Sequence, residues 1–150
     1  MPVTRVYLVR HAKAEEESGA GDDARRLTAE GRRRFRALAS ALSQRLSISR
    51  ILTSPYRRAR ETAEILAAGA GVRIEEDDAL ASGRSSGQEL LALARRAGAG
   101  AALVGHNPEM AEAVALAAGR HEKVRPGAIA AVDLVGGRAV LAWLEAPPAD

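Results

Sequence analysis

The chain has 150 residues and no cysteine, and its 22 Lys and Arg residues exceed its 19 Asp and Glu residues, for a net charge of +3. Without cysteine it can form neither disulfides nor thiolate metal sites, and its length is typical of one domain over residues 1–150. No apolar stretch approaches the roughly 18 residues of a membrane span, and "MPVTRVYLVRH" lacks the long apolar region of a signal peptide. We therefore expect a cytoplasmic protein without a membrane partner.

The first predicted elements are a strand and a helix joined by a polar loop. "VTRVYLV" (3–9) is rich in β-branched residues and predicts a strand, whereas the polar, glycine-containing segment 14–26 predicts a loop. Thr28 is a natural N-cap, and apolar residues recur every three or four positions from Phe35 to Leu46. This spacing predicts an amphipathic helix.

A second strand and helix follow directly. "SRILTS" (49–54) is a strand candidate, and Ser54 and Pro55 suit the N-cap and the first position of the next helix. Gly69 and Gly71 predict the end of that helix.

The pattern repeats once more before the end of the chain. "VRIEE" (72–76) predicts a weaker strand, and "SSGQELLALARRAG" predicts a capped helix that closes at Gly98. "GAALVGH" (100–106) reads as a buried strand, after which Asn107 and Pro108 repeat the cap-plus-proline start of a helix.

The last predicted elements are two strands in "AIAAVDLVGGRAVLAWLE", joined by the hairpin signal Gly136-Gly137. Strands that alternate with helices favour an α/β protein. We expect a three-layer α/β/α sandwich with a mostly parallel sheet and an antiparallel C-terminal hairpin.

Arginine-dense segments carry much of the positive charge. "ARRLTAEGRRRFR" and "SPYRRAR" hold almost no aromatic side chains and match no nucleic-acid-binding module, so we expect no nucleic-acid partner. The run from Arg32 to Arg36 is interpreted as a solvated helix face.

Three segments share one design, in which an apolar strand is followed by polar residues and a turn or helix start: "YLVRHA", "ILTSPYRRA" and "ALVGHNPEM". In open α/β sheets, ligands bind beyond the carboxyl ends of the strands, and helix N-termini there favour anions. The side chains expected to meet at that edge are Arg10, His11, one or more of Arg57, Arg58 and Arg60, and His106.

A phosphoryl group fits this set of side chains. Arginine presents a fork that matches phosphate oxygens, and an imidazole with one unprotonated nitrogen attacks phosphorus. A second histidine is able to donate to the phosphoryl oxygens during transfer. A metal held by His11 and His106 is the poorer interpretation, because the neighbouring arginines would repel a cation.

These segments resemble a known family. "LVRHAKAE", "TSPYRRARETAEIL" and "VGHNPEM" resemble the signature segments of the histidine phosphatase superfamily, in its small bacterial, SixA-like phosphohistidine phosphatase branch. The branch resemblance extends to "LTAEG" and "RPGAIAAVDL", so it covers nearly the whole chain. It implies a phosphoglycerate mutase-like fold and an enzyme that needs no metal or other cofactor.

The resemblance also assigns roles to single residues. His11 matches the nucleophile that becomes phosphorylated, and Arg10 matches its phosphate-binding neighbour. Arg58 matches the arginine of the second segment, and His106 matches the second catalytic histidine. Arg25 matches a branch arginine that lines the phosphate pocket.

The chain departs from the wider superfamily at the position of the general acid. Larger members carry a glutamate after the third strand, where this chain has Ser82 in "DDALASG", with acidic residues only upstream at 75–78. The small branch commonly lacks this acid too. This chain also has Arg26 where the branch usually has proline.

The resemblance implies a phosphatase that acts on phosphohistidine in a protein, such as a histidine-containing phosphotransfer domain, through a covalent intermediate on His11. The short connections, apart from loop 14–26, suit a phosphate displayed on a protein surface. Two alternatives stay open: a phosphomonoesterase acting on a small phosphorylated metabolite or nucleotide, and a phosphate-binding module without turnover.

Overall fold

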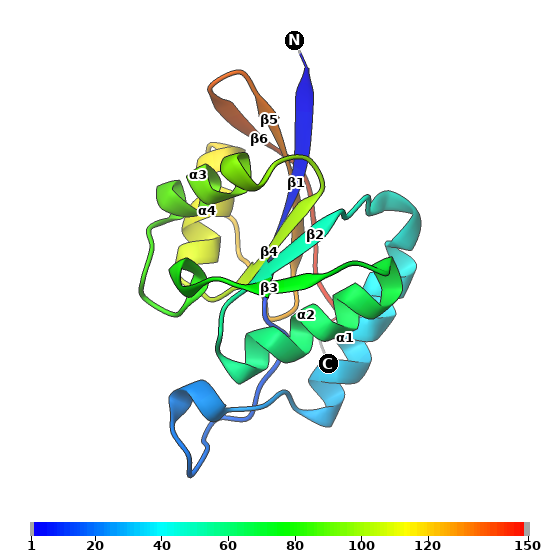
Figure 1. Cartoon of the computed structure of the whole chain (residues 1–150), viewed down its shortest axis with the longest axis vertical. Helices are drawn as coiled ribbons and strands as arrows, with labels where there is room; N and C mark the ends of the chain where they lie inside the picture. The colour runs from blue at the N-terminus through cyan, green and yellow to red at the C-terminus, as the bar shows by residue number, and fades with distance from the viewer. Residues whose placement is uncertain (1, 149–150) are drawn as a thin grey trace.

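A computed structural model of the chain describes residues 2–148, and within this range six strands form one sheet (Figure 1). The strands are β1 (Val3–Arg10), β2 (Arg50–Thr53), β3 (Ile74–Glu76), β4 (Ala101–Gly105), β5 (Ile129–Val135) and β6 (Arg138–Glu145). Their order is β3-β2-β4-β1-β5-β6, in which β3, β2, β4 and β1 are parallel and β5 and β6 are antiparallel additions. The predicted mostly parallel sheet with an antiparallel C-terminal hairpin is confirmed.

Helices cover both faces of the sheet. They are α1 (Ala29–Ala41), α2 (Arg57–Ala70), α3 (Gly87–Ala97) and α4 (Glu109–Ala118), with short 3₁₀ helices η1 (Asp22–Ala24), η2 (Ser43–Arg45) and η3 (Asp78–Leu80). Figure 1 shows α1 and α2 together on one side of the strands, and α3 and α4 on the other. The three-layer prediction is therefore confirmed.

Alternation along the strands explains this layering. Val6 and Leu8 of β1 join the buried cluster that includes residues of α3 and α4, whereas Tyr7 and Val9 join the cluster that includes residues of α1 and α2. Because successive strand residues point to opposite faces, a strand covered on both sides must be apolar throughout. The central strands are therefore continuous apolar runs.

Capping residues set the helix ends largely as the sequence predicts. The Thr28 side chain accepts a hydrogen bond from the Gly31 amide at the start of α1. Gly71 closes α2 at a φ of 69°, a left-handed conformation that glycine adopts without strain. Gly98 closes α3, which opens with a capping box between Ser86 and Glu89.

Three predicted helix boundaries are wrong. Helix α4 begins at Glu109 with Pro108 as its N-cap, so Pro108 is not the first helical residue and Asn107 is not the cap. Helix α2 begins at Arg57 rather than at Pro55, because the Ser54 side chain faces the sheet edge and stabilises a turn through the amide of Tyr56. Helix α1 ends at Ala41, and Leu46 follows η2 in extended backbone. The apolar pattern extends beyond the end of α1 because apolar residues of the segment that follows the helix also pack against the core.

Candidate active site

The carboxyl ends of β1, β2 and β4 meet at one edge of the sheet. Arg10 lies opposite Gly105 in the parallel ladder, and Thr53 lies opposite Val104. The residues that follow these strands are therefore brought together at the same edge. They are His11 after β1, Ser54 after β2 and His106 after β4.

His11 is buried and fixed in one orientation. Its backbone amide donates to the Gly105 carbonyl at 3.0 Å, and its Nδ1 lies 2.7 Å from the carbonyl oxygen of Ala12. Because a carbonyl only accepts, Nδ1 carries the proton and Nε2 holds the lone pair. Burial lowers the pKa of His11 from 6.5 to about 4, and the charges of Arg58 and Arg10 also lower it against the opposing Ala12 hydrogen bond.

His106 lies beside His11, with ring centroids 5.2 Å apart. Its Nε2 is 2.8 Å from the Ser54 hydroxyl oxygen, whereas its Nδ1 is buried without a hydrogen-bond partner. Burial and the neighbouring His11 and Arg58 lower the pKa of His106 to about 3. The edge of its ring also contacts Tyr56, whose centroid is 4.9 Å away.

Arg10 points into the same region. Its Nη1 donates to the Val124 carbonyl at 2.9 Å, and its Nε is buried with no hydrogen-bond partner. Burial lowers the pKa of the guanidinium below its usual value of 12.5. An unpaired N–H on a buried cation is costly unless an anion binds there.

Arg58 is the arginine of α2 that reaches the histidines. Its side chain is 5% exposed, and its Nε lies 3.4 Å from the Nε2 of His11. The other two nitrogens bind Asp22, through the backbone carbonyl at 2.7 Å and the carboxylate at 3.3 Å. The guanidinium also lies over the Tyr56 ring, 5.1 Å from its centroid.

The neighbouring arginines of this segment lie elsewhere. Arg57 forms an ion pair with Glu61 at 3.0 Å, and Arg60 lies 4.0 Å from Glu76. Both side chains are nearly half exposed, as expected for helix positions that do not face the sheet edge. The structure therefore brings Arg58, rather than Arg57 or Arg60, to the histidines.

Arg25 lies near this cluster, but its hydrogen bonds are with residues of its own loop. Its Nε donates to the Glu15 carbonyl at 2.6 Å, and its Nη1 donates to the Asp22 carboxylate at 2.9 Å. Its charge is among those that lower the pKa of His11. The side chain is thus close enough to act electrostatically on the site, and is held there by Asp22.

Sequence reasoning missed several residues that hold the site together. Ser54 was interpreted as a helix cap, although it binds His106. The Thr62 hydroxyl accepts from the Ala12 amide at 3.0 Å and donates to the Arg58 carbonyl at 2.8 Å, which ties α2 to the loop after β1. Asp22 carries no periodic signal, and Val124 acts through its backbone, so no pattern of side chains could have found them.

The expected position of a general acid holds none. Ser82 lies in a turn after η3 and is half-buried. Two of the acidic residues upstream have other partners: Glu75 binds Arg50 at 2.9 Å, and Asp77 accepts from the Ala79 amide at the start of η3. Glu109 is buried, and its carboxylate accepts from the Gly83 amide at 3.0 Å.

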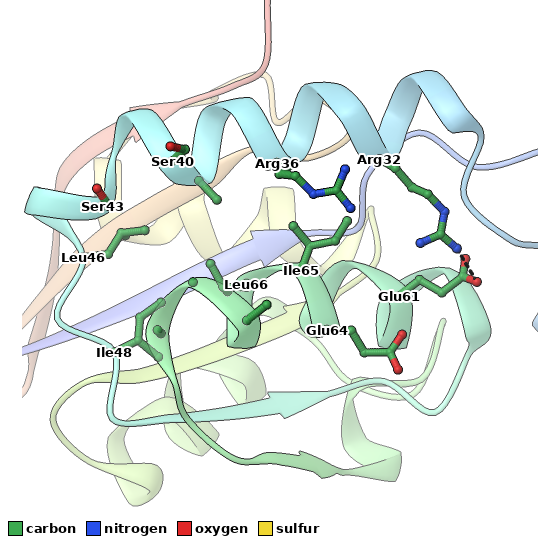
Figure 2. Close-up of a pocket in the computed structure, with 14 residues that line it drawn as sticks. Arg32, Arg36, Ser40, Ser43, Leu46, Ile48, Glu61, Glu64, Ile65 and Leu66 are labelled. Carbon is green, nitrogen blue, oxygen red and sulfur yellow. Dashed lines mark ion pairs between the residues drawn. The ribbon is translucent and has the colours of Figure 1, made fainter.

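A separate hollow lies between α1 and α2 (Figure 2), and we call it the α1–α2 groove. It has a volume of about 640 Å³. Half of its lining residues are Ala, Leu or Ile, and Arg32 is bound to Glu61 at 2.7 Å at one end. The lining residues are Arg32, Arg36, Ala39, Ser40, Ser43, Leu46, Ile48, Glu61, Glu64, Ile65, Leu66, Ala68, Gly69 and Ala70.

The histidine cluster, by which we mean Arg10, His11, Ser54, Arg58 and His106, is suited to bind a tetrahedral anion. Two guanidinium groups and a helix N-terminus supply positive potential, and two buried ring or guanidinium nitrogens lack partners. Among residues 2–148, no three His, Asp or Glu side chains are grouped to hold a metal ion.

Residues 6–98, more than half of the chain, match the histidine phosphatase superfamily (branch 1). The chain belongs to this superfamily. Most of β1, strands β2 and β3, and helices α1 to α3 fall in the matched range, together with His11 and Arg58.

Similar proteins place the chain in the SixA-like branch of the superfamily. The protein histidine phosphatase SixA, whose structure is known in complex with tungstate, has 26% sequence identity to this chain. The two structures align with a TM-score of 0.84 over 96% of this chain and 97% of that one. A protein from Agrobacterium tumefaciens assigned to the phosphohistidine phosphatase SixA gives the same identity and TM-score over 96% and 98%. An uncharacterized protein of Picosynechococcus sp. is 40% identical over 113 residues, which are 71% of this chain and 68% of that protein. The chain is a phosphatase of this branch.

Within the part of the chain that the structure describes, no helix has both the length and the apolar character needed to cross a bilayer.

Proposed function

We propose that this phosphatase removes the phosphoryl group from phosphohistidine in a partner protein, with His11 as the nucleophile. The state of the His11 ring carries the proposal. Its Nδ1–H is bound to the Ala12 carbonyl, so Nε2 holds the lone pair and faces the Nε of Arg58. A pKa of about 4 keeps the ring neutral at neutral pH, as attack on phosphorus requires.

The first step transfers the phosphoryl group to the enzyme. Nε2 of His11 forms a bond to phosphorus while the P–N bond of the substrate breaks, and its electron pair stays on the substrate nitrogen. Because the other nitrogen of that ring carries a proton, the substrate imidazole departs neutral. Departure therefore needs no proton from the enzyme, which is consistent with Ser82 in place of an acid.

The remaining residues of the cluster act on the phosphoryl oxygens. The unpaired Nε of Arg10 and the fork of Arg58 bind oxygens whose charge grows during transfer. When Ser54 donates to Nε2 of His106, the buried Nδ1 carries a proton and becomes a third donor. Arg25, held by Asp22, adds positive charge from the loop.

The second step releases phosphate. A water molecule attacks phosphorus from the side opposite His11, its oxygen becomes part of inorganic phosphate, and the proton it loses goes to solvent or to the phosphate. The electron pair of the breaking P–N bond returns to Nε2 of His11. The enzyme thus regains its neutral imidazole.

The proposed substrate is a protein because the relatives named above are SixA proteins, one of them described as a protein histidine phosphatase. The lack of an acid at Ser82 favours the same choice. An alkyl phosphate expels an alkoxide, and delivering a proton to it is commonly worth about 10² to 10⁴ in rate. A small phosphorylated metabolite or nucleotide is the alternative substrate.

A panel of substrates tests this proposal. It contains a phosphorylated histidine-containing phosphotransfer domain, aryl phosphates of graded phenol pKa, and a sugar phosphate. We expect the highest kcat/KM on the domain, lower values that fall steeply as the phenol pKa rises, and almost none on the sugar phosphate. A flat dependence on phenol pKa, or rapid hydrolysis of the sugar phosphate, would contradict the proposal and favour the metabolite.

A further inference from the structure

Asp22 contacts two arginines near the site, and no pattern in the sequence predicts these contacts. Its backbone carbonyl accepts from Nη1 of Arg58 at 2.7 Å, and its carboxylate accepts from Nη2 of Arg58 at 3.3 Å. The other carboxylate oxygen accepts from Nη1 of Arg25 at 2.9 Å. One residue therefore joins a buried arginine of α2 to an arginine of the loop.

These contacts fix the plane of the Arg58 guanidinium. Two of its three nitrogens are bound to the same residue, so the planar guanidinium cannot turn freely about the Cδ–Nε bond. Its Nε therefore stays directed at His11. A guanidinium binds phosphate well only when its planar fork faces the oxygens. A small misplacement of a group that binds the reacting phosphoryl lowers the rate strongly.

Asp22 is itself held by a loop with a closed base. The Glu15 amide donates to the Arg26 carbonyl at 2.9 Å, and the Thr28 amide donates to the Lys13 carbonyl at 3.0 Å. Figure 1 shows this loop, with η1 near its tip, beyond the end of β1. Through Asp22, this loop contacts Arg58 of α2.

The carboxylate of Asp22 is not a candidate proton donor. Its side chain is 60% exposed, and the hydrogen bond from Arg25, together with the charge of Arg58, lowers its pKa. It remains ionised at neutral pH and keeps both arginines as ion-pair partners. Its contribution must come through the arginines that it contacts.

We propose that Asp22 is a positioning residue that holds the Nε side of the Arg58 guanidinium toward the phosphoryl group and makes loop 14–26 part of the active site. The role of Arg58 in turnover rests on the proposed function, whereas the placement of its guanidinium affects the binding of any tetrahedral oxyanion. The affinity for tungstate, a tetrahedral oxyanion like phosphate, therefore tests this placement without turnover.

The test compares Asp22→Ala and Asp22→Asn with Asp23→Ala, a change in the same short helix η1. Calorimetry measures the Kd of tungstate, and kinetics on the phosphorylated domain measure kcat and KM. Asp22→Ala is expected to weaken tungstate binding about tenfold and to lower kcat/KM by about 10- to 100-fold. Asp22→Asn keeps an acceptor oxygen and is expected to recover part of the loss, and Asp23→Ala is expected to match the wild type.

The same change in an Arg58→Ala background separates positioning from a direct effect. Because Asp22 acts through Arg58, Asp22→Ala should add less than twofold to the loss caused by Arg58→Ala. A full additional loss, or wild-type tungstate binding by Asp22→Ala itself, would overturn the proposal. If the wild type binds tungstate but does not turn over the phosphorylated domain, the proposed function fails while the tungstate results still decide the role of Asp22.

Discussion

The histidine cluster and the α1–α2 groove differ in how their polar groups are satisfied. The groove has a volume of about 640 Å³ and an apolar lining, and its Arg32 and Glu61 are paired. In the histidine cluster, buried nitrogens of Arg10 and His106 lack hydrogen-bond partners. The size of a hollow therefore does not locate the chemistry of this protein, whereas unsatisfied buried polar atoms do.

The count of such atoms supports this comparison. Within residues 2–148, three buried side-chain atoms have no hydrogen-bond partner. One is Oε1 of Glu30, which still has ion pairs with Lys13 at 3.7 Å and Arg34 at 3.1 Å. The other two, on Arg10 and His106, belong to the histidine cluster. Because unpaired buried groups cost free energy, their presence together indicates a ligand that satisfies them.

The largest expected effect is the loss of the proposed nucleophile. His11→Ala should lower kcat on phosphohistidine by about 10³-fold or more, since no other group would take the phosphoryl. Steady-state kinetics measure this, with His121→Ala, an exposed histidine, as the control. Acid-labile label from substrate should appear on His11 in the wild type, and label elsewhere would contradict the mechanism.

The next effect distinguishes two neighbouring arginines. Arg58→Lys should lower kcat/KM by about 10²-fold, because lysine keeps the charge but loses the planar group whose Nε faces His11. Arg57→Ala should change it less than about threefold, since Arg57 is nearly half exposed and is paired with Glu61. Kinetics that rank the two variants in the opposite order would place the wrong arginine at the site.

The groove should respond in stability instead of activity. Leu66 lines the groove, is 2% exposed and belongs to the core, so Leu66→Ala should lower the free energy of unfolding by about 2 to 5 kcal/mol. Denaturant titration measures this, and Leu116→Ala, at a side chain that is 55% exposed, is the matched control. We expect kcat of the folded Leu66→Ala protein to be within about twofold of the wild type; a larger loss of kcat would mean that the groove contributes to catalysis.

The last expected effect is a dependence of stability on pH. The folded protein holds the pKa of His11 at about 4 and that of His106 at about 3, both below the usual value of 6.5. Between these lower values and pH 6.5, the unfolded chain therefore binds more protons than the folded protein. Stability is therefore full above pH 6.5 and falls as the pH drops toward 4, by up to about 1.4 kcal/mol per pH unit for each histidine. Denaturation at pH 7 and pH 5 measures the slope, which His11→Ala should reduce. A slope unchanged by that substitution would show that His11 is not buried as a neutral ring.

The sequence predicted the parts of the site that follow strands, and for a physical reason. His11 and His106 each come directly after a buried apolar run, and parallel strands bring such positions to one edge. The strand order could not be predicted in the same way, because it depends on which apolar strands pair, and all of them are similar in composition.

The prediction from sequence is wrong where one side chain has two possible hydrogen-bond partners. Ser54 next to Pro55 is a typical helix start, yet the hydroxyl binds the His106 ring and α2 begins later. Asp22 lies in a polar loop without periodicity, and the Val124 carbonyl belongs to a backbone group that every residue has. Contacts of this kind are decided by tertiary packing, so local patterns cannot reveal them.

The position of β1 has a consequence for how the protein is made. This first strand pairs only with β4 and β5, whose residues begin at 101 and 129. The Gly127 amide then donates to the carbonyls of Arg10 and His11, at 3.1 and 2.9 Å. During synthesis from the N-terminus, β1 has no sheet partner until β4 and β5 have been made. We therefore expect His11, the proposed nucleophile, to gain its contacts at the sheet edge only after these two strands have left the ribosome.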